Sequence, residues 1–232
     1  MRIFQSCCEM IREVERDLFE MGIRCHTETM QDKNIADDPS FETKEIMGYS
    51  FRIVDGGDKD AMLEFRGLDL KWAIREFAER VSPEWINPGS AWTLRGGVWE
   101  EFLKKGEGRF SYTYCERFRT QLPMIIEELK KHPNTRQAVM TIYEGPLDVP
   151  KLGVFRVPCS LSYQFLIREG KLHIIYVMRS TDLMTHFPYD VWLAITMMEH
   201  VAQKIGVKSG SFTMFAGSLH LYKKDVEGRN IF

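Results

Sequence analysis

A hairpin, a long apolar helix and a final strand follow one another in the second half of this chain, and their order restricts the fold. Val154–Ile167 and Leu172–Arg179 are rich in β-branched and aromatic residues, as strands are. The turn Arg168-Glu169-Gly170 between them predicts a hairpin. A helix ending near Ile205 and a strand over Ser211–Tyr222 follow. We expect an α+β fold with one large mixed sheet and one long buried core helix. The apolar stripe of that helix is Val191, Ile195, Met198, Ala202 and Ile205.

The first half of the chain is predicted to be mainly helical. Apolar residues recur at helical spacing over residues 1–22 and predict an amphipathic helix there. Thr43–Val54 is predicted as a strand, in which Gly48 marks a bulge or a close backbone approach. The remaining predictions are a helix with the stripe Leu70, Ile74, Phe77 and Val81, helices over 97–104 and 115–131, a strand over Ala138–Tyr143, and loops over 26–42 and 82–96.

Composition narrows the function classes. The chain has 232 residues, of which 44% are hydrophobic, so we expect a single domain over 1–232 with a sizeable core. The net charge is −2 with both signs mixed along the chain, which argues against nucleic-acid binding but leaves a small anionic ligand open. We expect no membrane span and no signal peptide.

The cysteines predict reduced thiols and a cytoplasmic protein, because their number is odd and their spacing suits neither disulfides nor a metal. No His lies near the adjacent pair Cys7 and Cys8, so we expect no metal site. The five residues are Cys7, Cys8, Cys25, Cys115 and Cys159.

Cys159 is the candidate nucleophile. It follows Pro158, which cannot donate a ladder hydrogen bond and so predicts an interrupted strand pairing beside the thiol. A lone Cys in a strand is more often a buried structural residue. Arg179 on the second strand of the hairpin favours the catalytic alternative, because a guanidinium near a thiol stabilises the thiolate.

Three further polar residues are ambiguous from the sequence. Glu76 lies within a predicted helix and is equally well explained as a solvated carboxylate. His220 and Tyr222 are two positions apart, so they point to the same face of the last strand. They could hydrogen-bond a sugar hydroxyl or be ordinary strand residues.

Several ordered motifs resemble thymidylate synthases and phage deoxycytidylate hydroxymethylases. The resemblance covers roughly residues 40–222, and so many motifs in the same order and spacing make a chance match improbable. The motifs are Thr43–Phe51, His132–Gln137, Pro158-Cys159, Tyr163-Gln164-Phe165, Met178–Asp182, Phe187–Asp190 and Gly217–Tyr222.

The resemblance implies a site for a pyrimidine nucleotide. Cys159 matches the nucleophile that adds to C6 of the base, which turns C5 into a carbon nucleophile. Arg136 matches a phosphate ligand that reaches across from a second subunit, so a homodimer is implied. The other nucleotide ligands implied are Arg179 and Ser180 for the phosphate, Asp182 for the base, and His220 and Tyr222 for the sugar.

The resemblance also implies 5,10-methylenetetrahydrofolate as co-substrate. Asp182 matches a residue shared by the pyrimidine and folate sites, and Trp99 matches an aromatic wall of the folate pocket. Glu76 matches a carboxylate that orders water and relays protons. Tyr112 matches a tyrosine that assists removal of the C5 proton.

Asp190 is the residue that discriminates between pyrimidines. Thymidylate synthases have Asn at the matching position, which can donate to O4 of uracil and accept from N3–H. An ionised carboxylate only accepts, so Asp190 favours the N4 amino group of cytosine. The alternative is that Asp190 serves only the first turn of the following helix. Ser218 and Ser160, where the synthases have Asp and His, also favour a hydroxymethylase.

We therefore expect one-carbon transfer to C5 of dCMP or CMP, giving the 5-hydroxymethyl nucleotide. The alternatives are a thymidylate synthase that methylates dUMP to dTMP, and a non-catalytic nucleotide-binding protein of the same fold.

The chain departs from the family pattern at several positions. Gln137 and Asp38 stand where phosphate-binding cations are expected, and Arg95 or Arg109 could compensate. His186 replaces a Gly. The tail after residue 222 is shorter than the segment that closes over folate in the family.

Overall fold

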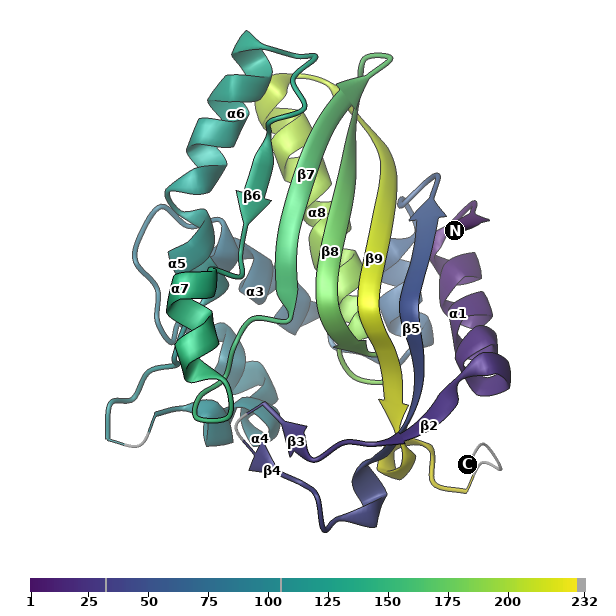
Figure 1. Cartoon of the computed structure of the whole chain (residues 1–232). Coiled ribbons are helices and arrows are strands. Elements are labelled where there is room, and N and C mark those ends of the chain that lie inside the picture. The colour runs from purple at the N-terminus through teal and green to yellow at the C-terminus, as the bar shows by residue number, and fades with distance from the viewer. Residues whose placement is uncertain (32, 105, 229–232) are drawn as a thin grey trace.

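A seven-stranded mixed sheet organises the computed structural model, which describes residues 1–31, 33–104 and 106–228 (Figure 1). Its order is β1-β5-β9-β8-β7-β6, and β2 pairs with the other end of β5. The β1–β5 and β8–β9 pairs are parallel and the others antiparallel, as the expected mixed sheet requires. The strands are β1 Arg2–Phe4, β2 Ile23–His26, β5 Glu42–Ile53, β6 Val139–Thr141, β7 Ser160–Arg168, β8 Lys171–Asp182 and β9 Lys208–Tyr222.

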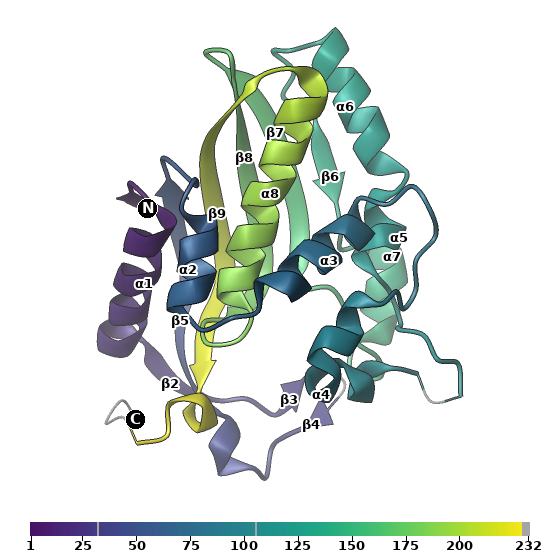
Figure 2. The ribbon, with the colours of Figure 1, turned by 180° about the vertical axis from the view of Figure 1, so that it is seen from behind.

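Helix α8 (Phe187–Ile205) is the predicted long core helix and lies along one face of the sheet (Figure 2). It connects β8 to β9, which are parallel and therefore need a crossover. Its buried side chains occur all round the helix, because other helices cover the side that faces away from the sheet. Gly206 ends it in the left-handed conformation, with φ of 75°.

The other helices are α1 Cys7–Met21, α2 Lys59–Phe65, α3 Leu70–Arg80, α4 Gly96–Trp99, α5 Tyr114–Phe118, α6 Gln121–Lys131 and α7 Gly145–Asp148. Helices α2, α3 and α6 pack against α8 (Figure 2), and α1 packs against α2 and β5. A small hairpin, β3 Thr29–Met30 and β4 Lys33–Asn34, stands apart from the main sheet. Short 3-10 turns cover 39–41, 91–95, 100–102, 149–151 and 223–226.

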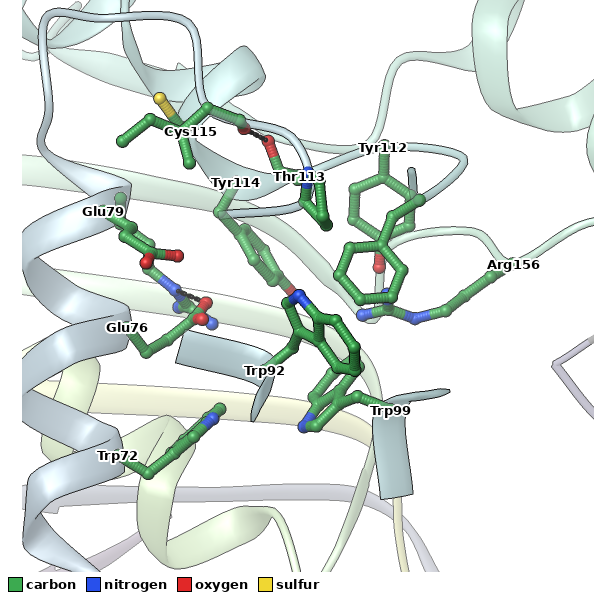
Figure 3. A pocket seen from close by; sticks show the side chains of 14 residues that line it. Trp72, Glu76, Glu79, Trp92, Trp99, Tyr112, Thr113, Tyr114, Cys115 and Arg156 are labelled. Carbon is green, nitrogen blue, oxygen red and sulfur yellow. Dashed lines mark hydrogen bonds and ion pairs between the residues drawn. The ribbon is translucent and has the colours of Figure 1, made fainter. Parts of the chain in front are cut away.

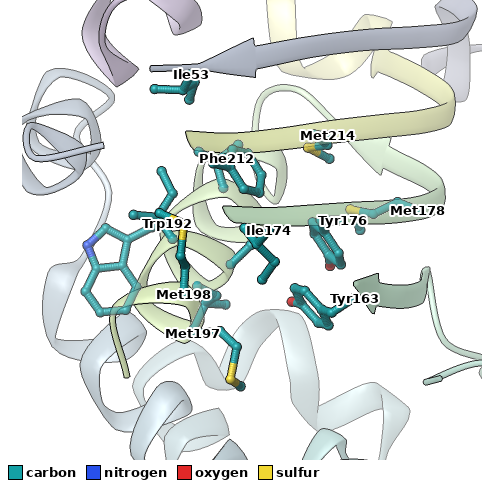
Figure 4. Packing of buried hydrophobic residues seen from close by; sticks show 14 of the residues in the cluster. Ile53, Tyr163, Ile174, Tyr176, Met178, Trp192, Met197, Met198, Phe212 and Met214 are labelled. Carbon is teal, nitrogen blue, oxygen red and sulfur yellow. The ribbon is translucent and has the colours of Figure 1, made fainter. Parts of the chain in front are cut away.

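The core lies between the sheet and α8. Alternate residues of β8 and β9, among them Ile174, Tyr176 and Met214, point into it (Figure 4). Tyr163 and Tyr176 stack on the inner face of the sheet, with ring centroids 4.3 Å apart and planes 5° from parallel. The hydroxyls of Tyr176 and Tyr114 each form a hydrogen bond with Ser160 Oγ, so both buried hydroxyls have a partner.

The predicted first residues of one helix and one strand were wrong. The helix predicted over 1–22 begins only at Cys7, because Arg2–Phe4 pairs in parallel with β5 and the Ser6 side chain caps the helix at Glu9 N. The strand predicted over Val154–Ile167 begins at Ser160. Its first residues lie in the segment after α7 and pair with no strand of the described residues.

The predicted helices also need correction. Residues 115–131 form two helices, α5 and α6. Pro123 in the first turn of α6 has no amide hydrogen to continue a helix from the preceding turn. Ile74 of the α3 stripe is exposed, whereas Trp72 and Ala73 are buried instead. Helix α2 was missed, and the loop predicted over 26–42 contains β3 and β4.

Gly217 allows β9 to lie close to β8 at Arg179. A Cβ at this position would stand 2.8 Å from the Arg179 backbone oxygen. We expect Gly217→Ala to destabilise the fold by about 1–3 kcal/mol, because the overpacked strands must separate. Urea denaturation measures the change.

The matched control is Gly145→Ala, where the added methyl meets nothing within 4 Å. We expect it to change stability by less than about 0.5 kcal/mol. Equal effects of the two variants would contradict the assigned contact.

Candidate functional site

A cavity of about 480 Å³ lies beside the carboxyl ends of β8 and β9, the start of α8 and the β3–β4 hairpin. Its volume suits a small-molecule ligand. Most residues singled out from the sequence line it together, while Glu76 and Arg136 are not among its lining residues. Those that line it are Trp99, Tyr112, Cys159, Arg179, Ser180, Asp182, Asp190, His220 and Tyr222.

The thiol of Cys159 is fixed against the carboxyl end of β8. The backbone N–H of Arg179 donates to the Cys159 carbonyl at 2.8 Å, and Arg179 Nε donates to the Pro158 carbonyl at 3.0 Å. Arg179 Nη2 then lies 3.5 Å from Cys159 Sγ, and Ser180 Oγ lies 4.0 Å from the same sulfur. A cation and a hydroxyl beside a thiol stabilise a thiolate nucleophile.

The parallel register of β8 and β9 brings two further predicted residues to the cavity. Asp182 is opposite His220, and the His220 and Tyr222 rings lie 5.2 Å apart. Burial lowers the pKa of His220 to about 4, so the imidazole is neutral. A neutral imidazole and a phenol can each donate to and accept from a ligand hydroxyl.

Asp190 lies in the first turn of α8 and accepts a hydrogen bond from Thr181 Oγ1 at 2.8 Å. Burial raises the pKa of its carboxyl to about 7, although the Thr181 bond and nearby Arg80 oppose that shift. Burial also raises the pKa of Asp182, which accepts hydrogen bonds from the Met184 amide and the Thr185 hydroxyl. Asp190 is thus poised between its neutral and ionised forms near neutral pH.

Glu76 on α3 lines a smaller cavity of about 50 Å³ that shares lining residues with the main one (Figure 3). Its Oε1 accepts from Arg80 Nε at 2.8 Å. The Arg80 guanidinium carbon lies 3.9 Å from the centroid of the Tyr114 ring, and Arg80 itself lines the main cavity. Glu76 therefore does not line the main cavity itself, but it is ion-paired with Arg80, which does.

Trp99 and Tyr112 enclose an arginine that the sequence did not single out. The Arg156 guanidinium lies 4.4 Å from the Trp99 ring centroid and 4.9 Å from that of Tyr112 (Figure 3). Within the described ranges, no ion pair or side-chain hydrogen bond is made by this guanidinium. Burial raises the pKa of Tyr112, so its phenol is neutral.

Arg95 is the one of the two proposed compensating arginines that enters the cavity. Its guanidinium carbon lies 4.8 Å from the Trp72 ring centroid and 4.9 Å from that of Tyr189. Its buried Nη1 has no hydrogen-bond partner in the part of the chain described. Its electrostatic neighbours include Asp190 and Asp182. It therefore lies between the aromatic end of the cavity and Asp190.

Arg109 does not compensate, because its guanidinium pairs with Glu107 at 2.7 Å on the surface and lies outside the cavity lining. Asp38 and Gln137 are exposed and also lie outside the lining. Arg136 is exposed too, with its backbone oxygen accepting from Gln164 Nε2 at 3.0 Å. The chain's own cavity thus gains no cation from these positions.

Sequence reasoning missed several lining residues, because each lies in a segment without a motif. His186, noted only as a replacement for Gly, packs 5.9 Å from the Trp99 ring, and burial with nearby Arg95 and Arg156 lowers its pKa to about 3. Gln31 lies against the Cys159 sulfur. Other missed residues include Thr27, Thr29, Arg80, Tyr114, Arg156, Lys224 and Asp225.

The described residues contain no cluster of three or more His, Cys, Asp or Glu that could hold a metal ion. Within the same ranges, no helix has the length and apolar character that a membrane span needs.

Sequence comparison identifies a family for most of the chain. Residues 39–231 match the family described as thymidylate synthase. A protein of Methanosarcina mazei named "Putative thymidylate synthase" is 34% identical over 190 residues, covering 69% of this chain and 85% of that protein. The protein of the same name from Methanosarcina barkeri is 34% identical over 137 residues, covering 54% of this chain and 62% of its own length, which is less than two thirds.

Structural comparison agrees on the fold. The thermostable thymidylate synthase A from Bacillus subtilis superposes with a TM-score of 0.71, covering 94% of this chain and 80% of that one at 16% sequence identity. The mixed sheet with its long core helix is therefore an architecture that the two chains share.

The raised pKa of Asp190 predicts a pH-dependent stability. The folded state holds the proton up to about pH 7, whereas the unfolded chain releases it near 3.8. The stability that this carboxyl contributes is therefore full below about pH 4 and is lost as the pH rises towards 7. Asp190→Asn lacks this loss, so we expect the variant to gain on the order of 2 kcal/mol relative to wild type between pH 4.5 and pH 7.5.

Urea denaturation of both proteins at the two pH values measures this gain. Asp182 and Asp225 titrate in both proteins, so their contributions largely cancel in the difference. A difference between variant and wild type that is the same at both pH values would show that Asp190 has an ordinary pKa.

Proposed function

The chain belongs to the thymidylate synthase family, and from that membership we propose that it transfers a one-carbon unit from 5,10-methylenetetrahydrofolate to C5 of a cytosine nucleotide. The observation that carries the proposal is the position of Asp190 in the same cavity as the Cys159 thiol and its Arg179 neighbour. The product is the 5-hydroxymethyl nucleotide.

The first step assigned to Cys159 is addition of its thiolate to C6 of the pyrimidine. The new S–C6 bond forms as the C5–C6 π electrons move to C5, which then attacks the methylene carbon of the co-substrate. Loss of the C5 proton and release of tetrahydrofolate leave an exocyclic methylene group. Water adds to this carbon, and the thiolate leaves as the ring double bond returns.

Tyr112 fits a proton relay at C5 better than a direct base. Burial raises the pKa of its phenol, so a free phenolate is unfavourable. A neutral phenol can still accept a proton while passing on its own, and the neighbouring Arg156 stabilises transient negative charge. Glu76 is proposed to order water near the base through its ion pair with Arg80.

Base selection is assigned to Asp190. When ionised, its carboxylate accepts from the N4 amino group of cytosine and repels O4 of uracil. When neutral, the acid can donate as well as accept and so can pair with either base. Because its pKa is raised to about 7, preference for cytosine is expected to increase as the pH rises above 7.

The aromatic end of the cavity is proposed to bind the co-substrate. Trp99 and Trp72 stack there with planes 13° from parallel, and Asp182 lies in the same cavity. Buried Trp72 Nε1, Trp99 Nε1 and Arg95 Nη1 lack partners among the described residues. Each unpaired buried donor costs roughly 1–3 kcal/mol, so side-chain movement that brings these donors to the acceptor oxygens of a bound ligand, such as a reduced folate, is favourable.

Arg179 and Ser180 are proposed to bind the nucleotide phosphate, and His220 and Tyr222 the sugar. An arginine and a hydroxyl provide fewer charge-assisted bonds than the family pattern, because Gln137 and Asp38 supply no cation. The proposed homodimer would add Arg136 from the partner subunit. The uncovered face of the sheet (Figure 1) supports that assembly. Val139 and Phe215 are 41% and 43% exposed, and they alternate with the buried residues Met140, Met214 and Ala216, so they point away from the core.

A second candidate is methylation of dUMP to dTMP. The names of the Methanosarcina relatives favour it, and neutral Asp190 could pair with uracil. A non-catalytic nucleotide-binding protein is the third candidate.

The decisive measurement is product analysis with dCMP, CMP and dUMP in competition, each with methylenetetrahydrofolate, at pH 6.5 and pH 8. We expect 5-hydroxymethylcytosine nucleotide by mass spectrometry and release of tritium from C5-labelled substrate. Cys159→Ala should abolish both. Asp190→Asn should shift kcat/KM towards dUMP by roughly 10- to 100-fold, since a donor then faces O4.

The alternatives give different results. Formation of dTMP with a rise in dihydrofolate absorbance would support the synthase, because only that reaction oxidises the folate. Nucleotide binding by calorimetry that survives Cys159→Ala, with no turnover of any pyrimidine, would support the binding protein.

The partner-subunit role of Arg136 is tested by mixing inactive variants. Arg136→Ala and Cys159→Ala each damage every site in a homodimer, but a mixed dimer has one site with both residues intact. We expect mixing after mild dissociation to restore up to about a quarter of wild-type activity, from mixed dimers with one good site. A monomer by light scattering, or no recovery on mixing, would reject the shared site.

A further inference from the structure

Gln31 makes two hydrogen bonds that fix its carboxamide against the proposed nucleophile. The Val157 backbone N–H donates to Gln31 Oε1 at 3.2 Å, and Gln31 Nε2 donates to Cys159 Sγ at 3.4 Å. A backbone N–H can only donate, so the amide oxygen must face Val157 and the amide NH₂ must face the sulfur. The orientation of the carboxamide is thus set by its surroundings.

The backbone of Gln31 is held in an unfavourable conformation. Its φ is 59°, in the left-handed region that non-glycine residues rarely adopt. The tight turn of the hairpin, in which Met30 pairs with Lys33, requires this positive φ at its first residue. Gln31 lines the cavity together with Thr29 and Met30 of β3.

The β3–β4 hairpin that carries Gln31 is itself held in place by several contacts. Met30 pairs with Lys33 across the hairpin, and the Ile35 N–H donates to Glu28 O at 2.9 Å. Lys33 makes an ion pair with Glu101, which follows α4, and its Nζ lies 4.9 Å from the centroid of the Phe102 ring. Both ribbon views show the hairpin beside α4 (Figures 1 and 2).

Gln31 completes the set of donors around the sulfur. Arg179 Nη2, Ser180 Oγ and Gln31 Nε2 lie 3.5, 4.0 and 3.4 Å from Cys159 Sγ. Among the described residues, no carboxylate is hydrogen-bonded to this sulfur. Arg179 and Ser180 are also the proposed phosphate ligands, whereas the second contact of Gln31 is with the backbone leading to Cys159. The amide can therefore stay on the sulfur when the nucleotide binds.

We propose that Gln31 is a positioning residue for the nucleophile: its amide NH₂ donates to the Cys159 thiolate, and its carbonyl holds the Val157 backbone that leads to Cys159. The inference rests on the proposed role of Cys159. It adds a residue from the β3–β4 hairpin, outside all the motifs that define the rest of the site.

The test compares two substitutions of similar size. Gln31→Glu keeps an oxygen for the Val157 N–H but replaces the donor to sulfur with a carboxylate. Gln31→Met removes both hydrogen bonds and adds no charge. The rate of Cys159 alkylation by iodoacetamide at pH 7, followed by mass spectrometry of the Cys159 peptide, reports the thiolate directly.

We expect Gln31→Met to slow alkylation about fivefold, because the Cys159 thiolate loses a hydrogen-bond donor. We expect Gln31→Glu to slow it about twentyfold or more, because the thiolate loses the same donor and is also repelled by the new carboxylate. If Gln31 only anchored the backbone, Gln31→Met would be the slower variant. That reversed order, or rates equal to wild type for both variants, would overturn the proposal.

Two controls complete the experiment. Gln137→Glu adds the same charge at an exposed position outside the cavity and should leave the rate within about twofold of wild type. Gln31→Gly accepts the positive φ without strain, so near-UV circular dichroism should show a folded protein, with alkylation slowed as in Gln31→Met.

Alkylation needs neither nucleotide nor folate, so its outcome is independent of the proposed reaction. A protein without one-carbon transfer that still shows the expected order of rates would retain the positioning role and lose only the assigned chemistry.

Discussion

The pairing of β8 with its two neighbours is the constraint on which the site depends. Towards β7, the Arg179 N–H bonds the Cys159 carbonyl and its guanidinium bonds the Pro158 carbonyl, so cation and thiol are held together by backbone contacts. Towards β9, the parallel register puts Asp182 opposite His220. Gly217 allows this second approach, because any side chain would meet the Arg179 carbonyl. A shift of β8 by one residue would turn each of these side chains to the opposite face of the sheet.

Desolvation decides the charge of the groups that face the cavity. Burial holds His186 and His220 neutral and brings the pKa of Asp190 to about 7. Arg80 and Arg95, in contrast, lie against aromatic rings, Arg80 on Tyr114 and Arg95 on Trp72. Guanidinium groups suit such places because they are weakly hydrated and stack on aromatic faces. The result is a cavity rich in donors at its aromatic end and beside its thiol, which suits anionic and carbonyl-bearing ligands.

Elements with regular periodicity were predictable, and irregular ones were not. The hairpin at Arg168-Glu169-Gly170, the core helix and the last strand were confirmed because alternation and helical spacing report burial directly. The segment 154–159 has the composition of a strand, but no strand in the described part of the chain pairs with it. Arg2–Phe4 fits a helical stripe and yet pairs with β5, because three residues are too few to distinguish the two periods.

The sequence by itself determined the fold class and most of the candidate site, because Cys159, Arg179, Asp182 and Asp190 belong to ordered motifs that lie just before β7, on β8 and at the start of α8. Only the tertiary structure decided the rest. Arg95, Arg156 and Gln31 come from segments without periodicity. Their contacts with Tyr189, Trp99 and Cys159 respectively each join residues more than fifty positions apart in the sequence. The protonation of Asp190 was also decided there, since a pKa follows from the water that the surrounding chain excludes and not from the residue type.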